Sequence, residues 1–136
     1  MAEISDLNIS DANNTARWPA GTMTTSQVDD AGRAVEGILA RFYKDNNGSN
    51  TTAGTGAAYT LTLNRSGATT LAAIGIIVVR AHVANTGAAT ININALGAKA
   101  IRKKGDAVLV VGDILQNDIV FLVYNPARDN FQLMGV

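Results

Sequence analysis

Apolar residues recur at intervals of three and four along residues 26–47. They fall at Val28, Ala31, Val35, Ile38 and Phe42. This spacing places all five side chains on one stripe of an α-helix, because the helix turns once every 3.6 residues. The pattern therefore predicts one amphipathic helix over residues 26–47, and no other stretch of the chain has a comparable helical period.

Both ends of this expected helix carry chemical signals. Ser26 is the expected cap of the amino end, with Asp29 three residues later in the position of a capping box. Asn46, Asn47 and Gly48 supply a stop, because Asn and Gly tolerate the left-handed conformation that ends many helices.

The apolar stripe needs a packing partner. Gly32 and Gly37 lie off the stripe, and each costs a helix about 1 kcal/mol relative to alanine. The stripe could join identical chains in a short parallel bundle, with three chains favoured, or it could pack on the rest of the same chain. It covers just over two heptads, fewer than the roughly 3–4 that identify a coiled coil from sequence. Periodicity alone therefore favours packing within the chain.

The chain after residue 56 reads as short strands separated by turns. Tyr59, Leu61 and Leu63 alternate with polar residues, which places them on one face of a strand. The apolar run 71–83, broken by a glycine, contains a strand expected to be central and buried on both faces. The expected strands cover 58–64, 76–79, 90–94, 99–103, 108–111, 119–124 and 130–134, and residues 125–129 are expected to turn the last hairpin. Strands of this length and spacing predict a small antiparallel β-sandwich or barrel.

These patterns divide the chain into three parts. Residues 1–25 form a polar extended arm, residues 26–47 the helix, and residues 57–136 the β domain, with a Gly- and Asn-rich connector over 46–56. The arm holds the one tryptophan of the chain, Trp18. An arm with so little apolar content either docks on another chain or packs back on its own domain through that side chain.

Composition excludes several classes of function. Eleven basic and eleven acidic residues cancel, so no charge excess indicates binding to nucleic acid. No apolar run reaches the roughly 18 residues that would insert into a membrane, and the first residues lack the pattern of a signal peptide. The chain has no cysteine, which excludes disulfides and thiolate metal sites.

Candidate chemistry is sparse. His82 is the one histidine, and no serine stands in a Gly-x-Ser-x-Gly turn that would accompany it in a hydrolase. Residues 45–48 lack the ligand spacing and closing glutamate of a calcium loop. Asp106, Asp113 and Asp118 flank turns, where capping is a more common role than catalysis. The sequence therefore predicts no enzyme, no catalytic residue, no cofactor and no metal site.

Two stretches of this sequence resemble a known family. They are residues 14–41, with Asn-Thr-Ala-Arg-Trp-Pro followed by the helix, and residues 82–103, with Asn-Thr-Gly-Ala-Ala-Thr-x-Asn-x-Asn-x-Leu-Gly-Ala. Both are similar to the N-terminal region of tail-fibre and related virion proteins of tailed bacteriophages. The resemblance implies a non-enzymatic structural protein of the virion that assembles as a homotrimer through the helical stripe. It also implies that the arm docks on another virion protein, through Asn14, Arg17, Trp18 and Pro19.

The resemblance leaves several roles open. Fibres of this family usually continue into a shaft and a receptor-binding tip, whereas this sequence stops at Val136. The expected role is a short tail fibre or spike, or an adaptor that receives a longer fibre. The alternatives are a capsid-decorating protein (a cement or head-fibre protein) and a module that binds a host glycan or receptor. In each case the expected location is the virion, after synthesis in the host cytoplasm.

Overall fold

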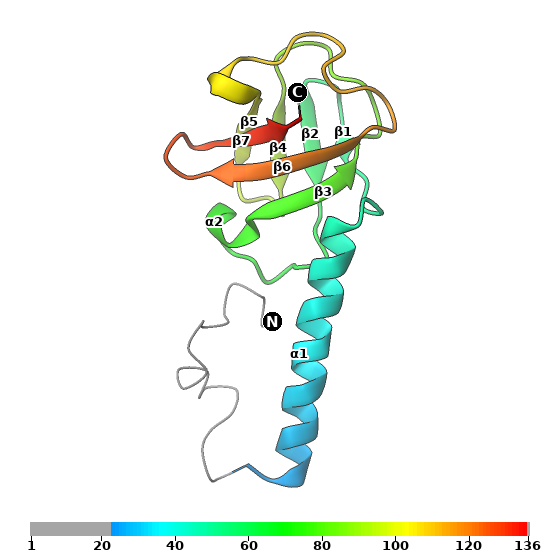
Figure 1. Cartoon of the computed structure of the whole chain (residues 1–136), viewed down its shortest axis with the longest axis vertical. Coiled ribbons are helices and arrows are strands. Elements are labelled where there is room, and N and C mark those ends of the chain that lie inside the picture. Colours follow the sequence, from blue (N-terminus) through cyan, green and yellow to red (C-terminus); the bar gives the residue numbers. More distant parts are fainter. Residues whose placement is uncertain (1–22, 136) are drawn as a thin grey trace.

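The computed structural model describes residues 23–135 and consists of one long helix that projects from a small barrel of strands (Figure 1). Helix α1 covers Thr25–Asn46, within one residue of the expected bounds. The rest of the described chain is mainly β structure. The predicted class, mainly β with one principal helix, is confirmed.

Helix α1 has a different cap from the one expected. The hydroxyl of Thr24 accepts a hydrogen bond from the backbone N–H of Gln27 at 3.3 Å, and the side-chain oxygen of Gln27 accepts one from the backbone N–H of Thr24 at 2.8 Å. These reciprocal bonds form a capping box. The predicted box of Ser26 and Asp29 is wrong, because Ser26 already lies inside the helix.

Seven strands form one mixed sheet in the order β1-β2-β4-β5-β7-β6-β3. The strands are β1 Ala53–Gly54, β2 Ala58–Leu61, β3 Ile76–Arg80, β4 Thr90–Ile93, β5 Ala98–Arg102, β6 Ile119–Asn125 and β7 Asn130–Met134. The pairs β2–β4 and β5–β7 are parallel and the others antiparallel. The expected antiparallel sheet is therefore corrected to a mixed one. Alternation of apolar and polar residues reports which face is buried, but it carries no information on strand direction.

Residues 48–54, expected to be a connector, close the sheet into a barrel. On one side they pair with β3: the N–H of Gly48 donates to the carbonyl of Val78 at 3.2 Å, and the N–H of Arg80 donates to the carbonyl of Asn50 at 2.8 Å. On the other side β1 pairs with β2. Because β3 and β1 are the two ends of the strand order, this segment joins the edges of the sheet.

Strand β3 differs in part from the central, doubly buried strand that was expected. It is last in the strand order and gains its second neighbour only from the closing segment. Ile77 and Val79 are fully buried on the inner face, and Val78 is buried on the outer face, whereas Ile76 is exposed there. The expected burial is therefore found on the inner face of β3, but on its outer face it is absent at Ile76.

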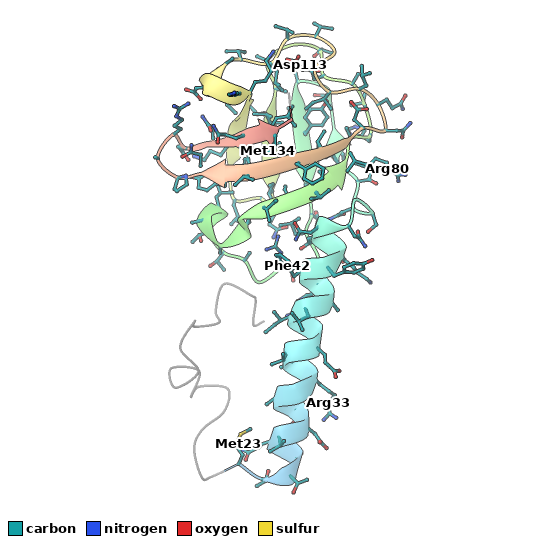
Figure 2. All side chains as sticks on the ribbon, in the orientation of Figure 1. Met23, Arg33, Phe42, Arg80, Asp113 and Met134 are labelled. Atoms are coloured by element: carbon teal, nitrogen blue, oxygen red, sulfur yellow. The ribbon has the colours of Figure 1, made fainter. Side chains whose placement is uncertain are left out.

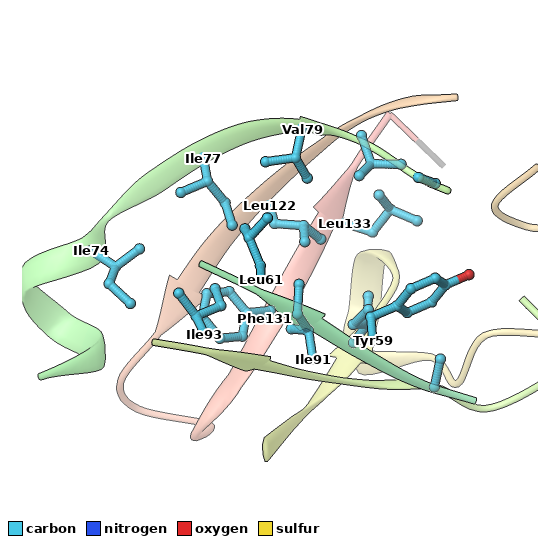
Figure 3. Close-up of a cluster of buried hydrophobic side chains, with 14 of the residues drawn as sticks. Tyr59, Leu61, Ile74, Ile77, Val79, Ile91, Ile93, Leu122, Phe131 and Leu133 are labelled. Carbon is cyan, nitrogen blue, oxygen red and sulfur yellow. The ribbon is translucent and has the colours of Figure 1, made fainter. Parts of the chain in front are cut away.

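The hydrophobic core fills the interior of the barrel (Figure 3). The predicted face of Tyr59, Leu61 and Leu63 is confirmed, because all three side chains are buried. Side chains from the other strands meet them in the interior, including Ile77, Val79, Ile91, Ile93, Leu122, Phe131 and Leu133. Close packing of these strands fixes the barrel to which α1 is attached.

The apolar run 71–83 begins with a helical turn before its strand, and the strand predicted at 108–111 does not form. Leu71–Ile74 forms a single helical turn, α2, capped by the hydroxyl of Thr70. Residues 108–111 form a loop, with only an isolated bridge from Val108 to Arg102. A short 3-10 helix, η3, covers Lys104–Asp106 just before this loop. The final hairpin is confirmed: β6 and β7 pair antiparallel around the turn at 125–129.

Candidate functional site

The C-terminal end of α1 is joined to the barrel by a buried ion pair. Asp45 is fully buried, and its Oδ2 lies 3.0 Å from Nε of Arg65, which is 1% exposed. The other carboxylate oxygen accepts hydrogen bonds from the backbone N–H and the side-chain amide of Asn64, at 2.8 and 2.9 Å. A buried carboxylate is tolerated when it is both paired and hydrogen-bonded, and Asp45 meets both conditions.

Arg65 extends this junction to two further elements. Its Nη1 donates to the carbonyl of Ile74 at the end of α2, at 2.9 Å, and its Nη2 donates to the carbonyl of Ile76 in β3, at 3.4 Å. The guanidinium carbon lies 5.2 Å from the centre of the Phe42 ring on α1. Phe42 lies near the barrel end of the helix in Figure 2. Directional bonds therefore fix the orientation of α1 relative to the barrel.

The predicted oligomer-interface residues of α1 lie in three environments. Ala31 and Ile38 are buried within the single chain, Val35 and Phe42 are half-buried, and Val28 is 46% exposed. The buried pair is spaced by seven residues, and the next position at this spacing is Asp45 of the junction. One edge of the stripe is thus already covered, while another edge faces solvent.

The exposed apolar surface of α1 lies mainly beside the predicted stripe. Leu39, which widens the stripe, is 54% exposed, and Tyr43 is 68% exposed. With Val28 they leave large apolar side chains in solvent along the helix. The predicted docking residues of the arm, Asn14, Arg17, Trp18 and Pro19, lie outside the described residues, so their role stays a prediction.

The outer surfaces of the barrel differ in chemistry. We call six apolar side chains on the outer face of β3, β6 and β7 the apolar wall: Ile76, Val78, Ile119, Phe121, Val123 and Met134. Arg80, opposite Ile119, and Gln132, opposite Val123, are the polar groups at its margin. The outward side chains of β2, β4 and β5 form a wall of small, polar and charged groups, here the polar wall: Ala58, Thr60, Thr90, Asn92, Ala98, Ala100 and Arg102. Sequence reasoning did not separate these walls, because both alternate in the same way.

The loop over residues 107–118 is held by side chains that bond to its backbone. The buried amide of Asn85 donates to the carbonyl of Val110 at 2.7 Å and its oxygen accepts from the N–H of Ile114 at 2.9 Å. Asp113 accepts from Nζ of Lys103 at 2.9 Å and from the N–H of Val110. The hydrogen bond from Lys103, and then that from Val110, hold the pKa of Asp113 below its usual value. Hydrogen bonds to Asn85, Lys103 and Asp113 therefore hold this loop in one conformation.

His82, the one histidine, takes part in hydrogen bonds that stabilise the fold. His82 Nδ1 lies 2.9 Å from the hydroxyl of Thr52, and its Nε2 lies 3.1 Å from the carbonyl of Gly54. Both ring nitrogens thus bond to the segment that closes the barrel, as expected for a structural histidine. Among residues 23–135, no three or more His, Cys, Asp or Glu side chains are grouped so as to hold a metal ion. Over the same residues, no helix is long and apolar enough to cross a membrane.

The other side chains whose pKa is shifted also take part in structural contacts. The hydroxyl of Tyr124 donates to Asp129 at 2.7 Å, which raises the pKa of Tyr124. Lys99 lies 2.6 Å from the same carboxylate, and its hydrogen bond, followed by that of Tyr124, lowers the pKa of Asp129. Burial raises the pKa of Tyr59, whose hydroxyl donates to the carbonyl of Val83 at 2.9 Å. These contacts join strand ends and turns.

A hollow of about 430 Å³ lies beside the end of β7. It is lined by Lys104, Gly105, Gln132, Leu133, Met134 and Gly135. Among the described residues, Lys104 is the one charged side chain of this lining.

Comparison with known proteins identifies no family for this chain. The chain matches no protein-family model, and a search of curated proteins finds no significant match. The functional argument starts from three features of the structure: a buried ionic junction, a projecting helix with exposed apolar side chains, and a barrel with one apolar wall.

Proposed function

We propose that this chain is a structural protein of a bacteriophage virion, a short tail fibre, spike or fibre-adaptor. In this proposal α1 joins three identical chains, and residues 1–25 dock on another virion protein. The observation that carries it is the exposed apolar edge of a helix that is rigidly attached to its barrel. The sequence resemblance to tail-fibre proteins supplies the biological context.

The exposed edge supports self-association on physical grounds. Leu39 and Tyr43 are more than half exposed on a helix whose other apolar edge is already buried. Burying a large apolar side chain contributes about 1.5–3 kcal/mol, so covering this edge with a neighbouring helix is favourable. The ionic junction at Asp45 and Arg65 keeps each helix in one orientation, which limits the entropy lost on assembly.

A matched pair of variants tests the assembly. Leu39→Glu places a charge on the exposed apolar edge, whereas Ala40→Glu places it one residue away on the polar side of α1. We expect the wild-type chain and Ala40→Glu to sediment as trimers at micromolar concentration and Leu39→Glu as a monomer. Leu39 is a better target than Ile38, because Ile38 is fully buried and a charge there would also destabilise the monomer.

Sedimentation with light scattering reads out the mass of each variant. A wild-type chain that stays monomeric, both in solution and when bound to particles, would contradict the proposal. Circular dichroism of Leu39→Glu controls for folding, since a folded monomer separates lost assembly from lost structure.

The capsid-decorating role differs from the leading one in location. A density map of a whole particle distinguishes a position on the tail from one on the head. Trp18→Ala tests docking by the arm in either case: the variant is expected to be lost from particles while it keeps its solution assembly. Retention of Trp18→Ala on particles would contradict docking through this residue.

A glycan- or receptor-binding module is the second candidate. Its supporting observation is the polar wall, where Thr60, Thr90 and Asn92 present hydroxyl and amide groups. Sugar sites usually also use an exposed aromatic ring. The exposed rings of the described chain are Tyr43 on α1 and Phe121 on the apolar wall, away from these groups. Binding of the isolated protein to a glycan array, lost on Thr60→Ala, would favour this candidate.

A further inference from the structure

The apolar wall is a continuous surface of the barrel. Phe121 lies directly opposite Val78 on β3 and Met134 on β7, and Val123 lies opposite Ile76. Four of its side chains, Ile76, Ile119, Phe121 and Met134, are between 41% and 54% exposed. Strands β3, β6 and β7 lie together on the near side of the barrel in Figure 1. Contiguous apolar surface on three neighbouring strands is typical of an interaction site.

This wall begins where α1 ends. The backbone of Gly48 lies against the side chain of Ile119, so that a Cβ there would stand 3.3 Å from its Cδ1. The N–H of Gly48 also bonds to the carbonyl of Val78 on β3, the edge strand of the wall. Strand β3 is moreover the strand against which α1 packs. The apolar wall therefore begins beside the C-terminal end of α1, at Gly48.

The helix alone offers too little surface for a stable assembly. A whole aromatic side chain covers about 150–250 Å² and aliphatic ones less, so three side chains about half exposed supply on the order of 300 Å². A standard specific interface buries about 800 Å² on each partner. The four exposed side chains of the wall add a similar amount, so the apolar area that each chain offers to its neighbours doubles to about 600 Å².

The rigid junction determines where a second barrel comes to lie. Because Asp45 and Arg65 fix α1 to the barrel, copies that join in parallel along α1 place their barrels at the same end. The barrels then stand side by side next to the C-terminal ends of the helices, which is where the apolar wall begins. A different partner could use the wall, but only another copy is brought to it by the helix itself.

We propose that a second copy of this chain covers the apolar wall, so that the assembly interface extends from α1 onto β3, β6 and β7. This inference rests on the proposed self-association through α1. It assigns a binding role to Phe121, Ile119 and Met134, which the sequence pattern placed only in strands. The polar wall then forms the outer surface of the assembly.

Charge variants on the two walls test the interface in the full chain. Phe121→Glu alters the apolar wall, and Thr60→Glu alters the polar wall at an outward strand position. We expect Phe121→Glu to raise the dissociation constant of the assembly at least tenfold in sedimentation velocity, and Thr60→Glu to leave it unchanged. Circular dichroism and thermal unfolding of each variant report whether the barrel still folds.

Thiol labelling tests the same surface without a charge. The chain has no cysteine, so Met134→Cys and Thr60→Cys each introduce a single thiol. We expect Cys at position 134 to react with a maleimide at least tenfold more slowly in the assembly than in the Leu39→Glu background. Cys at position 60 is expected to react at the same rate in both. This readout decides the question even if Phe121→Glu fails to fold.

The outcomes separate the two proposals. If Leu39→Glu dissociates the chains while position 134 reacts equally fast in both states, the helix interface stands and the role of the wall is overturned. If the wild-type chain is monomeric, both are overturned. If position 134 is protected only when another virion protein is added, the wall binds that protein, and the inference of a second copy is wrong.

Discussion

The two ends of helix α1 are held in place by different interactions. At the C-terminal end, Asp45 is fully buried and pairs with Arg65 of the barrel. At the N-terminal end, Val28 is exposed, and the helix begins with the capping box of Thr24 and Gln27. The exposed pair of Asp30 and Arg33, at 2.6 Å, is the counterpart of the buried pair.

One helix therefore combines a C-terminal end that is fixed to the barrel with an N-terminal end that is accessible to solvent. Bonds to the barrel fix the C-terminal end, so breaking them lowers the free energy of unfolding of the whole domain. The N-terminal turns depend on local terms such as caps and helix propensity, each about 1 kcal/mol. Variants at the two ends should therefore differ both in the size of their effect and in what they destabilise.

The largest effect is expected from Asp45→Ala. Removing this carboxylate leaves the buried guanidinium of Arg65 without its ionic partner, which costs about 3–5 kcal/mol. Urea unfolding followed by circular dichroism measures this loss for the whole domain. Asp30→Ala is the matched control, because its pair with Arg33 is exposed and should contribute less than about 1 kcal/mol. Equal losses in the two variants would contradict the distinction between the ends.

A smaller and local effect is expected from Thr24→Ala. Loss of the cap costs about 1 kcal/mol, which corresponds to about fivefold weaker protection of the first helical turn. Amide hydrogen exchange should detect this change over residues 25–30, while exchange in the barrel strands stays the same. Faster exchange throughout the barrel would show that the two ends of α1 are coupled. Thr24→Ser, which keeps the hydroxyl, serves as the control.

The smallest effect, and one of opposite sign, is expected from Gly32→Ala. A Cβ at this position meets no atom within 4 Å, so the substitution gains helix propensity without a clash. We expect about 0.5–1 kcal/mol of added helix stability, seen as slower exchange in the N-terminal half of α1. Gly37→Ala should gain less, because its Cβ would stand 3.1 Å from Nη1 of Arg41. Gly32 lies seven residues before Leu39 and so shares its edge of the helix. The comparison is therefore made in the Leu39→Glu background, where a loss of stability on Gly32→Ala would contradict the open space beside this residue.

Local patterns predicted a large part of this fold. The period of the apolar residues located α1 to within a residue, and alternation located the core face of Tyr59, Leu61 and Leu63. The turn at 125–129 and the hairpin around it also followed from sequence. In each case the signal lies within a few residues of the feature, because helices and hairpins are built from contacts between neighbours in the chain.

The wrong predictions concern segments whose partners are far away in the sequence, and the helix cap, for which Thr24 and Ser26 are both suitable residues. Val108 to Val111 have the composition of a strand, but the bonds from Asn85 and Asp113 hold them in a loop. The closing segment at 48–54 looks like a flexible connector, and only its partners on β3 and β2 make it part of the sheet. The sequence did contain one indication of the role of Asp45: it lies seven residues after Ile38 and so continues the apolar stripe, where a carboxylate needs a partner.

The sequence by itself determined the position of α1, of most strands and of the last turn, and the apolar face of β2, because these properties repeat with the period of each element. Tertiary structure alone decided that Asp45 meets Arg65, that two strand pairs run parallel, and that the exposed apolar residues of three strands gather on one wall. Each of these depends on residues that are far apart in the chain and become neighbours only when the barrel closes.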